Sequence, residues 1–163
     1  MKRVLLYIGI LALLLAAPVE SADIGKLRPV QVVSVYKENN WVVMHTDTED
    51  KGYGSTAKQA LQNLKDTSNG IIYLDTADYL LVTKDTIDAA EELRKDLKDS
   101  VQLCMTAKQV DLVEVSQYLS IRGDLPKLKD WSEGEELPVL SSFGDSLIFL
   151  KKVEKELDKM RGR

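Results

Sequence analysis

The chain carries few side chains suited to nucleophilic or metal chemistry. Its 163 residues include one histidine, His45, and one cysteine, Cys104. A zinc cluster, a disulfide framework or a CxxC redox pair each needs more of these ligands than the chain contains. His45 has no second histidine near it in sequence, so a structural or surface role is favoured over general-base catalysis, which needs a partnered group. We therefore expect no metal site and no cofactor.

Two short patterns resemble catalytic or ligand-binding motifs. The tetrapeptide from Ser55 to Lys58 (STAK) matches the S-x-x-K of serine acyl-enzymes, but the companion S-D-N and K-T-G elements are absent. We expect Ser55 or Thr56 to cap a helix instead. The acidic segment 47–52 misses the spacing of a calcium-binding EF-hand loop, and 52–54 (GYG) lacks the lysine of a phosphate-binding loop. An ordinary loop before a helix is the favoured interpretation.

The remaining candidates for acid/base chemistry are Asp75 and Asp78, which flank a turn between two apolar runs. Carboxylates in such positions usually hydrogen-bond turn amides. A small extracytoplasmic hydrolase using Asp75, Asp78, His45 or Ser55 is the competing hypothesis to a protein without catalytic activity.

A long connection near the C-terminus contains the predicted binding residues. Segment 124–142 holds two prolines, a glycine and the candidate residues Trp131, Glu133, Glu135 and Glu136. Long connections in compact domains are often functional, and an exposed tryptophan gives a large contact area. We predict that these four residues contact a partner with a basic or polar surface. The alternative is that Trp131 packs on the core.

The elements that must position these residues follow from hydrophobic periodicity. We expect a hairpin of strands over 30–36 and 41–46, further strands over 71–74, 79–82 and 101–106, and helices from Ser55 or Thr56, over 86–97 and from Asp111. Run 71–74 is continuous and apolar, which is typical of a strand buried on both faces. Residues 123–142 are expected to form an irregular loop and 143–163 an amphipathic helix beginning at Asp145 or Ser146. This order predicts one small layered α/β domain whose mixed, partly antiparallel sheet has helices packed on it.

The N-terminus has the pattern of a leader. Lys2 and Arg3 precede a 14-residue apolar run from Val4 to Ala17, and small residues follow Pro18. A membrane-spanning helix needs about 20 apolar residues, so 1–22 is predicted to be a signal peptide, with an uncleaved N-terminal membrane anchor as the alternative. We expect an exported, extracytoplasmic protein. The chain's formal charge of −4 disfavours nucleic-acid binding.

Residues 54–64 (GSTAKQALQNL) and 71–82 (IIYLDTADYLLV) resemble the N-terminal domain of the Ger(x)C family of spore germination proteins. The matched positions are Gly54, Thr56, Ala60, Leu61, Asn63, Leu64, Tyr73 and 80–82. The pattern extends over roughly 23–122. Full-length members are longer lipoproteins, whereas this chain has no cysteine at the predicted cleavage zone.

This resemblance implies a non-catalytic accessory subunit of a membrane germinant receptor. The implied partner is another protein at the cell envelope or in a germinant-receptor-like complex. Contact with the membrane is expected only through the N-terminal segment, if it stays uncleaved.

Overall fold

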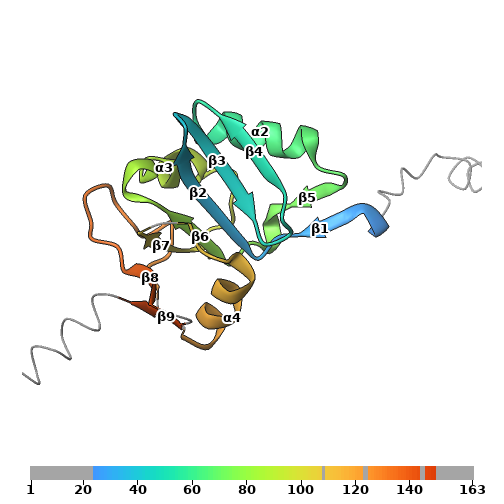
Figure 1. Ribbon diagram of the computed structural model, residues 1–163. Helices are drawn as coiled ribbons and strands as arrows, with labels where there is room; N and C mark the ends of the chain where they lie inside the picture. Colours follow the sequence, from blue (N-terminus) through green and yellow to red (C-terminus); the bar gives the residue numbers. More distant parts are fainter. Residues whose placement is uncertain (1–23, 108, 123–124, 144–145, 150–163) are drawn as a thin grey trace, which may run out of the picture.

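The computed structural model describes residues 24–107, 109–122, 125–143 and 146–149 (Figure 1). The predicted leader, 1–22, and most of the predicted C-terminal helix, 150–163, lie outside the described residues.

The described residues form a mixed sheet with helices on both faces. Its order is β4-β3-β2-β6-β7-β8-β9. Strands β2, β6, β7 and β8 run parallel, while β3 and β4 at one end and β9 at the other pair antiparallel. The mixed, partly antiparallel α/β sheet predicted from the sequence is therefore confirmed. The strand bounds are β2 (Val32–Glu38), β3 (Trp41–Thr46), β4 (Lys51–Gly54), β6 (Tyr79–Val82), β7 (Gln102–Thr106), β8 (Val139–Phe143) and β9 (Ser146–Phe149).

The β2–β3 hairpin has a two-residue turn. Asn39 and Asn40 both have positive φ, 48° and 70°, and Glu38 pairs directly with Trp41. Positive φ at both central residues defines the tight turn whose twist matches that of paired strands, and asparagine tolerates this conformation well. The predicted hairpin is confirmed, and its register fixes which side chains share a face.

Helices cover the two faces of the sheet separately (Figure 1). α2 (Ala57–Thr67) and α3 (Ala89–Leu93) pack on one face, and α4 (Leu112–Arg122) packs on the other. Strand β6 is buried along its whole length, as its continuous apolar run indicates. Three short 3-10 helices complete the connections: η1 (Ile24–Lys26), η2 (Leu74–Thr76) and η3 (Lys84–Thr86).

α2 lies unusually close to β4. Its N-cap is Thr56, whose hydroxyl accepts from the Gln59 amide at 3.2 Å. A Cβ at Gly52 or Gly54 would overlap the α2 backbone around Ala60, so glycine is required on both sides of Tyr53. The predicted stripe on α2 is buried as expected: Ala57, Ala60, Leu61 and Leu64.

Three expectations about secondary structure were wrong. Residues 71–74 do not form a doubly buried strand, because β5 (Ile71–Tyr73) pairs with β1 (Leu27–Pro29) in a separate two-stranded sheet that leaves Ile71 49% exposed. The segment 86–97 does not form one continuous helix. The 3-10 helix η3 ends at Thr86, and the α-helix α3 covers only Ala89–Leu93.

The third error concerns the C-terminal region. Ser146–Phe149 is strand β9, not the start of a helix from 143, because it pairs with β8 in a hairpin. The Phe149 ring also packs against Tyr118 of α4, with 5.8 Å between ring centroids. The irregular loop therefore ends before Val139 rather than at 142.

Candidate functional site

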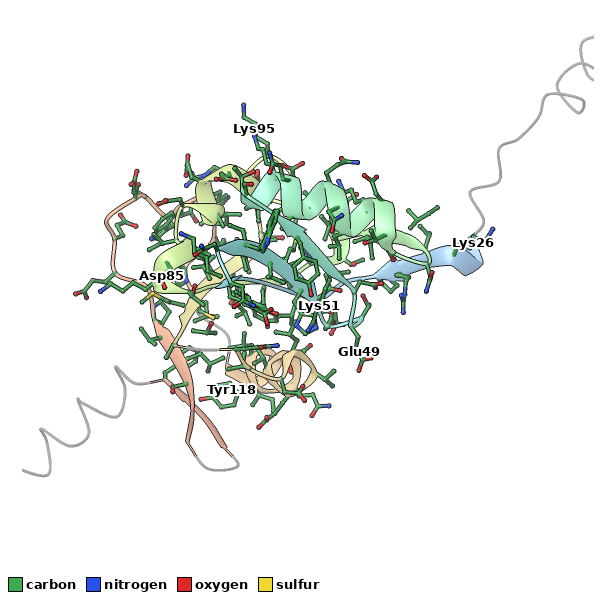
Figure 2. All side chains as sticks on the ribbon, turned by 45° about the horizontal axis from the view of Figure 1, so that its top comes forward. Lys26, Glu49, Lys51, Asp85, Lys95 and Tyr118 are labelled. Atoms are coloured by element: carbon green, nitrogen blue, oxygen red, sulfur yellow. The ribbon has the colours of Figure 1, made fainter. Side chains whose placement is uncertain are left out.

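An open cleft of about 620 Å³ lies on the α4 face of the sheet, between the β3–β4 hairpin and the start of α4. Residues from β3, β4, the loop between them and the segment that enters α4 line it. Figure 2 shows two of them, Lys51 and Glu49, beside the ribbon of α4, with Tyr118 further along that helix. The chemically relevant lining residues are His45, Asp47, Glu49, Lys51, Asp111 and Val113.

Strand alternation and a helix cap position these groups. Met44 packs in the core under α2, so its neighbour His45 points to the opposite face, and Lys51 pairs directly with His45 across the β3–β4 ladder. Asp111 caps α4, because its Oδ1 accepts from the amides of Val113 at 2.9 Å and Glu114 at 3.1 Å. The cap therefore fixes where α4 begins.

The cleft is acidic, because Asp47, Glu49 and Asp111 outnumber Lys51. The Asp47 carboxylate accepts from the Gln31 amide at 3.1 and 3.2 Å through its two oxygens, while burial raises the pKa of Asp47. An excess of carboxylates along the walls of a cleft creates a negative potential there. The cleft thus favours cationic ligands over anionic ones.

His45 is half-buried in the cleft. Burial lowers its pKa, and the nearby Lys51 acts in the same direction, while Glu49 and Asp111 oppose them. Its Nδ1 is buried and has no hydrogen-bond partner among the described residues. None of the described residues therefore orients the ring through that nitrogen, as the base of a catalytic dyad would require.

Aromatic residues extend the site along the same face of the hairpin. Trp41 and Tyr53 are 53% and 47% exposed. The register places Val43 directly opposite both Tyr36 and Tyr53, with Trp41 two residues before Val43 on β3. Trp41, Val43 and His45 share one face of β3 by alternation. We call the exposed or half-buried members of this face the hairpin surface: Trp41, Tyr53, His45 and Lys51.

Tyr36 lies on the same face of the sheet, on β2 directly opposite Val43. It is 5% exposed, and its hydroxyl has no hydrogen-bond partner among the described residues. Burial raises the pKa of Tyr36, with smaller contributions from Glu38 and Tyr53. Glu38 pairs with Trp41 across the hairpin, so a carboxylate also lies at the aromatic end of the hairpin surface.

The structure places Trp131 in the core. Its side chain is 2% exposed and packs with Leu128 and Leu137, and its Nε1 donates to the Glu135 carbonyl at 3.2 Å. This matches the alternative in which the tryptophan covers the core, so the ring is not an exposed contact. The partner residues predicted beside it are exposed, and their binding role stays a prediction: Glu133, Glu135 and Glu136.

The four residues of the hydrolase hypothesis are not brought together. Among the described residues, no hydrogen bond joins any two of His45, Ser55, Asp75 and Asp78. Asp78 instead pairs with Lys98 at 2.7 Å. Ser55 lines a separate cleft of about 120 Å³ beside the start of α2. In the described part of the chain, no three potential ligands lie close enough to hold a metal ion.

These features define a small mixed α/β domain with an open acidic cleft and an aromatic surface. The chain matches no protein-family model, no curated protein and no solved structure. Within the described ranges, no helix is both long and apolar enough to cross a membrane.

Sequence reasoning missed the hairpin surface. Alternation over 41–46 was available as a signal that Trp41 shares a face with His45. The residues from Lys51 to Tyr53 were interpreted as a loop, so nothing placed them beside β3. Strand β4 was missed because two of its four residues are glycines, which are rare in strands.

Proposed function

We propose that the protein is a non-catalytic, exported interaction module that binds another protein at the cell envelope. The observation that carries this proposal is the hairpin surface, where Trp41 and Tyr53 are about half exposed next to an open cleft. Tryptophan and tyrosine are enriched at the energetic centres of protein interfaces. Among the described residues that line the cleft, the histidine has no hydrogen-bond partner at its buried Nδ1, which supports a binding role over general-base catalysis.

The Ger(x)C resemblance supports an accessory role in a germinant-receptor-like complex. Its matched residues include Ala60, Leu61 and Leu64 of α2 and 80–82 of β6, all of which are buried. Gly54 permits the close approach of α2 to β4. The resemblance thus rests on positions that determine packing, and it supports a shared architecture more directly than a shared ligand.

An affinity pull-down from the native cell envelope tests the proposal. The full-length protein should recover a specific envelope protein, and Trp41→Ala should lose it while the fold is retained. Ile121→Ala is a matched control, because Ile121 is 84% exposed at the far end of α4. Recovery of no specific partner by the wild-type protein would contradict an interaction role.

Export is tested separately by mass spectrometry of the protein from its native cells. A mature N-terminus near Ala22 or Asp23 is expected from the predicted cleavage zone. Recovery of intact Met1 in the membrane fraction would support the anchor alternative, and intact Met1 in the cytoplasm would contradict export.

A further inference from the structure

We infer that the hairpin surface and its cleft bind a basic segment of the partner protein. In this arrangement a lysine or arginine side chain of the partner lies over the Trp41 and Tyr53 rings, and neighbouring basic groups face the cleft carboxylates. The inference rests on the proposed function, because it names the chemistry of the partner for the same site.

The charge distribution favours a cationic segment. Glu38 lies opposite Trp41 at one end of the hairpin surface, and Glu49 and Asp111 line the cleft at the other end. Among the described residues that line the cleft, the lysine or arginine present is Lys51, against three carboxylates. A ligand that spans both ends therefore meets carboxylates on either side of the aromatic pair. Anionic partners would be repelled, and the whole chain is also acidic, with 26 carboxylates against 22 basic side chains.

The exposed rings favour the same partner chemistry. The negative face of an aromatic ring attracts ammonium and guanidinium groups, and tryptophan does so most strongly. Trp41 and Tyr53 lie diagonally across the β3–β4 ladder, since Val43 is directly opposite Tyr53. Diagonal positions are about 7–8 Å apart, close enough for one long basic side chain to contact both rings.

Val43 lies between two tyrosines on this face of the hairpin. It has no exposed surface, and its direct cross-strand neighbours are Tyr36 on β2 and Tyr53 on β4. Directly opposite residues on one face lie about 4.5–5.5 Å apart. The exposed Tyr53 ring therefore begins beside a fully buried part of the sheet.

The second cleft offers a weaker case. It measures about 120 Å³ and is also acidic, with Asp85, Asp88 and Glu92 in its lining. Glu92 already accepts from the Lys58 amide at 3.3 Å, at the start of α2. One of its three carboxylates therefore already serves the fold, and no large exposed hydrophobic residue is among its described lining residues.

The test uses the full-length protein and a short oligolysine peptide as the probe, with oligoglutamate as the probe of opposite charge. Binding is followed by nuclear magnetic resonance, in which the indole N–H signals of Trp41 and Trp131 are separate reporters. Oligolysine should shift the Trp41 indole and the amides around Tyr53 and His45, and oligoglutamate should not. Added salt should weaken the binding, because exposed charges are screened.

Matched variants locate the site. Trp41→Ala and Glu49→Gln should each weaken oligolysine binding about two- to fivefold, as expected for exposed cation–π and ionic contacts. Asp66→Asn removes the same charge from the exposed side of α2, on the other face of the sheet, and should leave the affinity unchanged. Shifts spread evenly over the surface, or equal weakening by Asp66→Asn, would overturn the inference.

Two other occupants give different results, and either would overturn it. If a second copy covers the hairpin surface, acrylamide quenching of Trp41 should decrease as the protein concentration rises. If the chain's own residues 150–163 occupy it, oligolysine should bind only after Lys151, Lys152 and Lys155 are changed to glutamate.

The results also separate this inference from the proposed function. If an envelope partner is recovered equally well by the wild-type protein and by Trp41→Ala, this inference is refuted and the proposed function is preserved. Oligolysine binding without any envelope partner would refute the proposed function and preserve the cationic chemistry.

Discussion

The two tryptophans provide a matched test of which surface is structural and which is available for binding. Trp131 is 2% exposed and Trp41 is 53% exposed. Replacing each with alanine removes the same atoms from opposite environments. We expect Trp131→Ala to destabilise the fold strongly and Trp41→Ala to affect binding with a smaller effect on stability.

The magnitudes follow from the buried area. A tryptophan buries up to about 250 Å², and alanine in its place still buries some of that area, so Trp131→Ala exposes or empties about 200 Å². At about 25 cal/mol per Å² this gives ~5 kcal/mol as an upper value. Core truncations of this kind typically lower the free energy of unfolding by about 3–5 kcal/mol. Trp41 is 53% exposed, so about half of that area is lost on truncation, and the same conversion gives about 2.5 kcal/mol as the upper value and about 1–2 kcal/mol as the expected loss.

Urea unfolding followed by far-ultraviolet circular dichroism is the appropriate assay, because its signal comes mainly from the backbone and, unlike fluorescence, survives the loss of either tryptophan. The slope of the unfolding free energy against urea should be the same for all three proteins, so that midpoints compare stability alone. A loss below about 1 kcal/mol in Trp131→Ala would refute the buried placement of the ring. An equal loss in the two variants would refute the assignment of Trp41 to an open surface.

Three further predictions concern other parts of the structure. Gly52→Ala should lower the free energy of unfolding, measured by chemical denaturation, by ~3 kcal/mol, because the added Cβ would overlap the α2 backbone at Ala60. Gly134 lies in open space at φ 94°, so Gly134→Ala should lower the same free energy by about 1–2 kcal/mol through backbone strain alone. Burial lowers the pKa of His45, so the unfolded chain binds its proton more readily. Stability should therefore fall as pH drops below about 6.5, and His45→Gln should flatten the curve just below that pH. Burial raises the pKa of Cys104 to about 12, so a thiol reagent at pH 8 should react with the unfolded protein and not with the native one.

Much of the fold was predictable from local pattern. The β2–β3 hairpin, helix α2 and strands β6 and β7 each carry a clear alternation, stripe or apolar run. The errors arose where tertiary pairing decides the structure. Residues 71–74 and 79–82 are both short apolar runs, yet only the second enters the central sheet. Hydrophobic periodicity shows that a segment is apolar, but it does not show which strand the segment will pair with.

The same limit applied to the candidate site. Trp131 lies in a segment with prolines and glutamates, a composition typical of exposed loops. The connection from α4 to β8 nevertheless begins on the α4 face of the sheet. Its residues Leu128, Trp131 and Leu137 pack in the core on the opposite face, under α2 and α3. Arg94 holds the segment there, because its Nη2 donates to the Trp131 carbonyl at 2.7 Å. Composition alone does not reveal that a chain crosses between faces.

The exposure of Trp41 and Tyr53 follows from how little of one face a single helix can cover. Neighbouring strands are about 4.8 Å apart and a helix with its side chains is about 10–12 Å wide. On its face, α4 packs over residues contributed by β2, β6, β7 and β8, while β3 and β4 extend beyond it. Smaller β-branched residues suit a strand face of this kind and would expose less apolar surface to water. Rings at Trp41 and Tyr53 instead leave a large apolar area half exposed beside acidic groups, which is the pattern expected if, as proposed, this surface holds a partner's basic side chain.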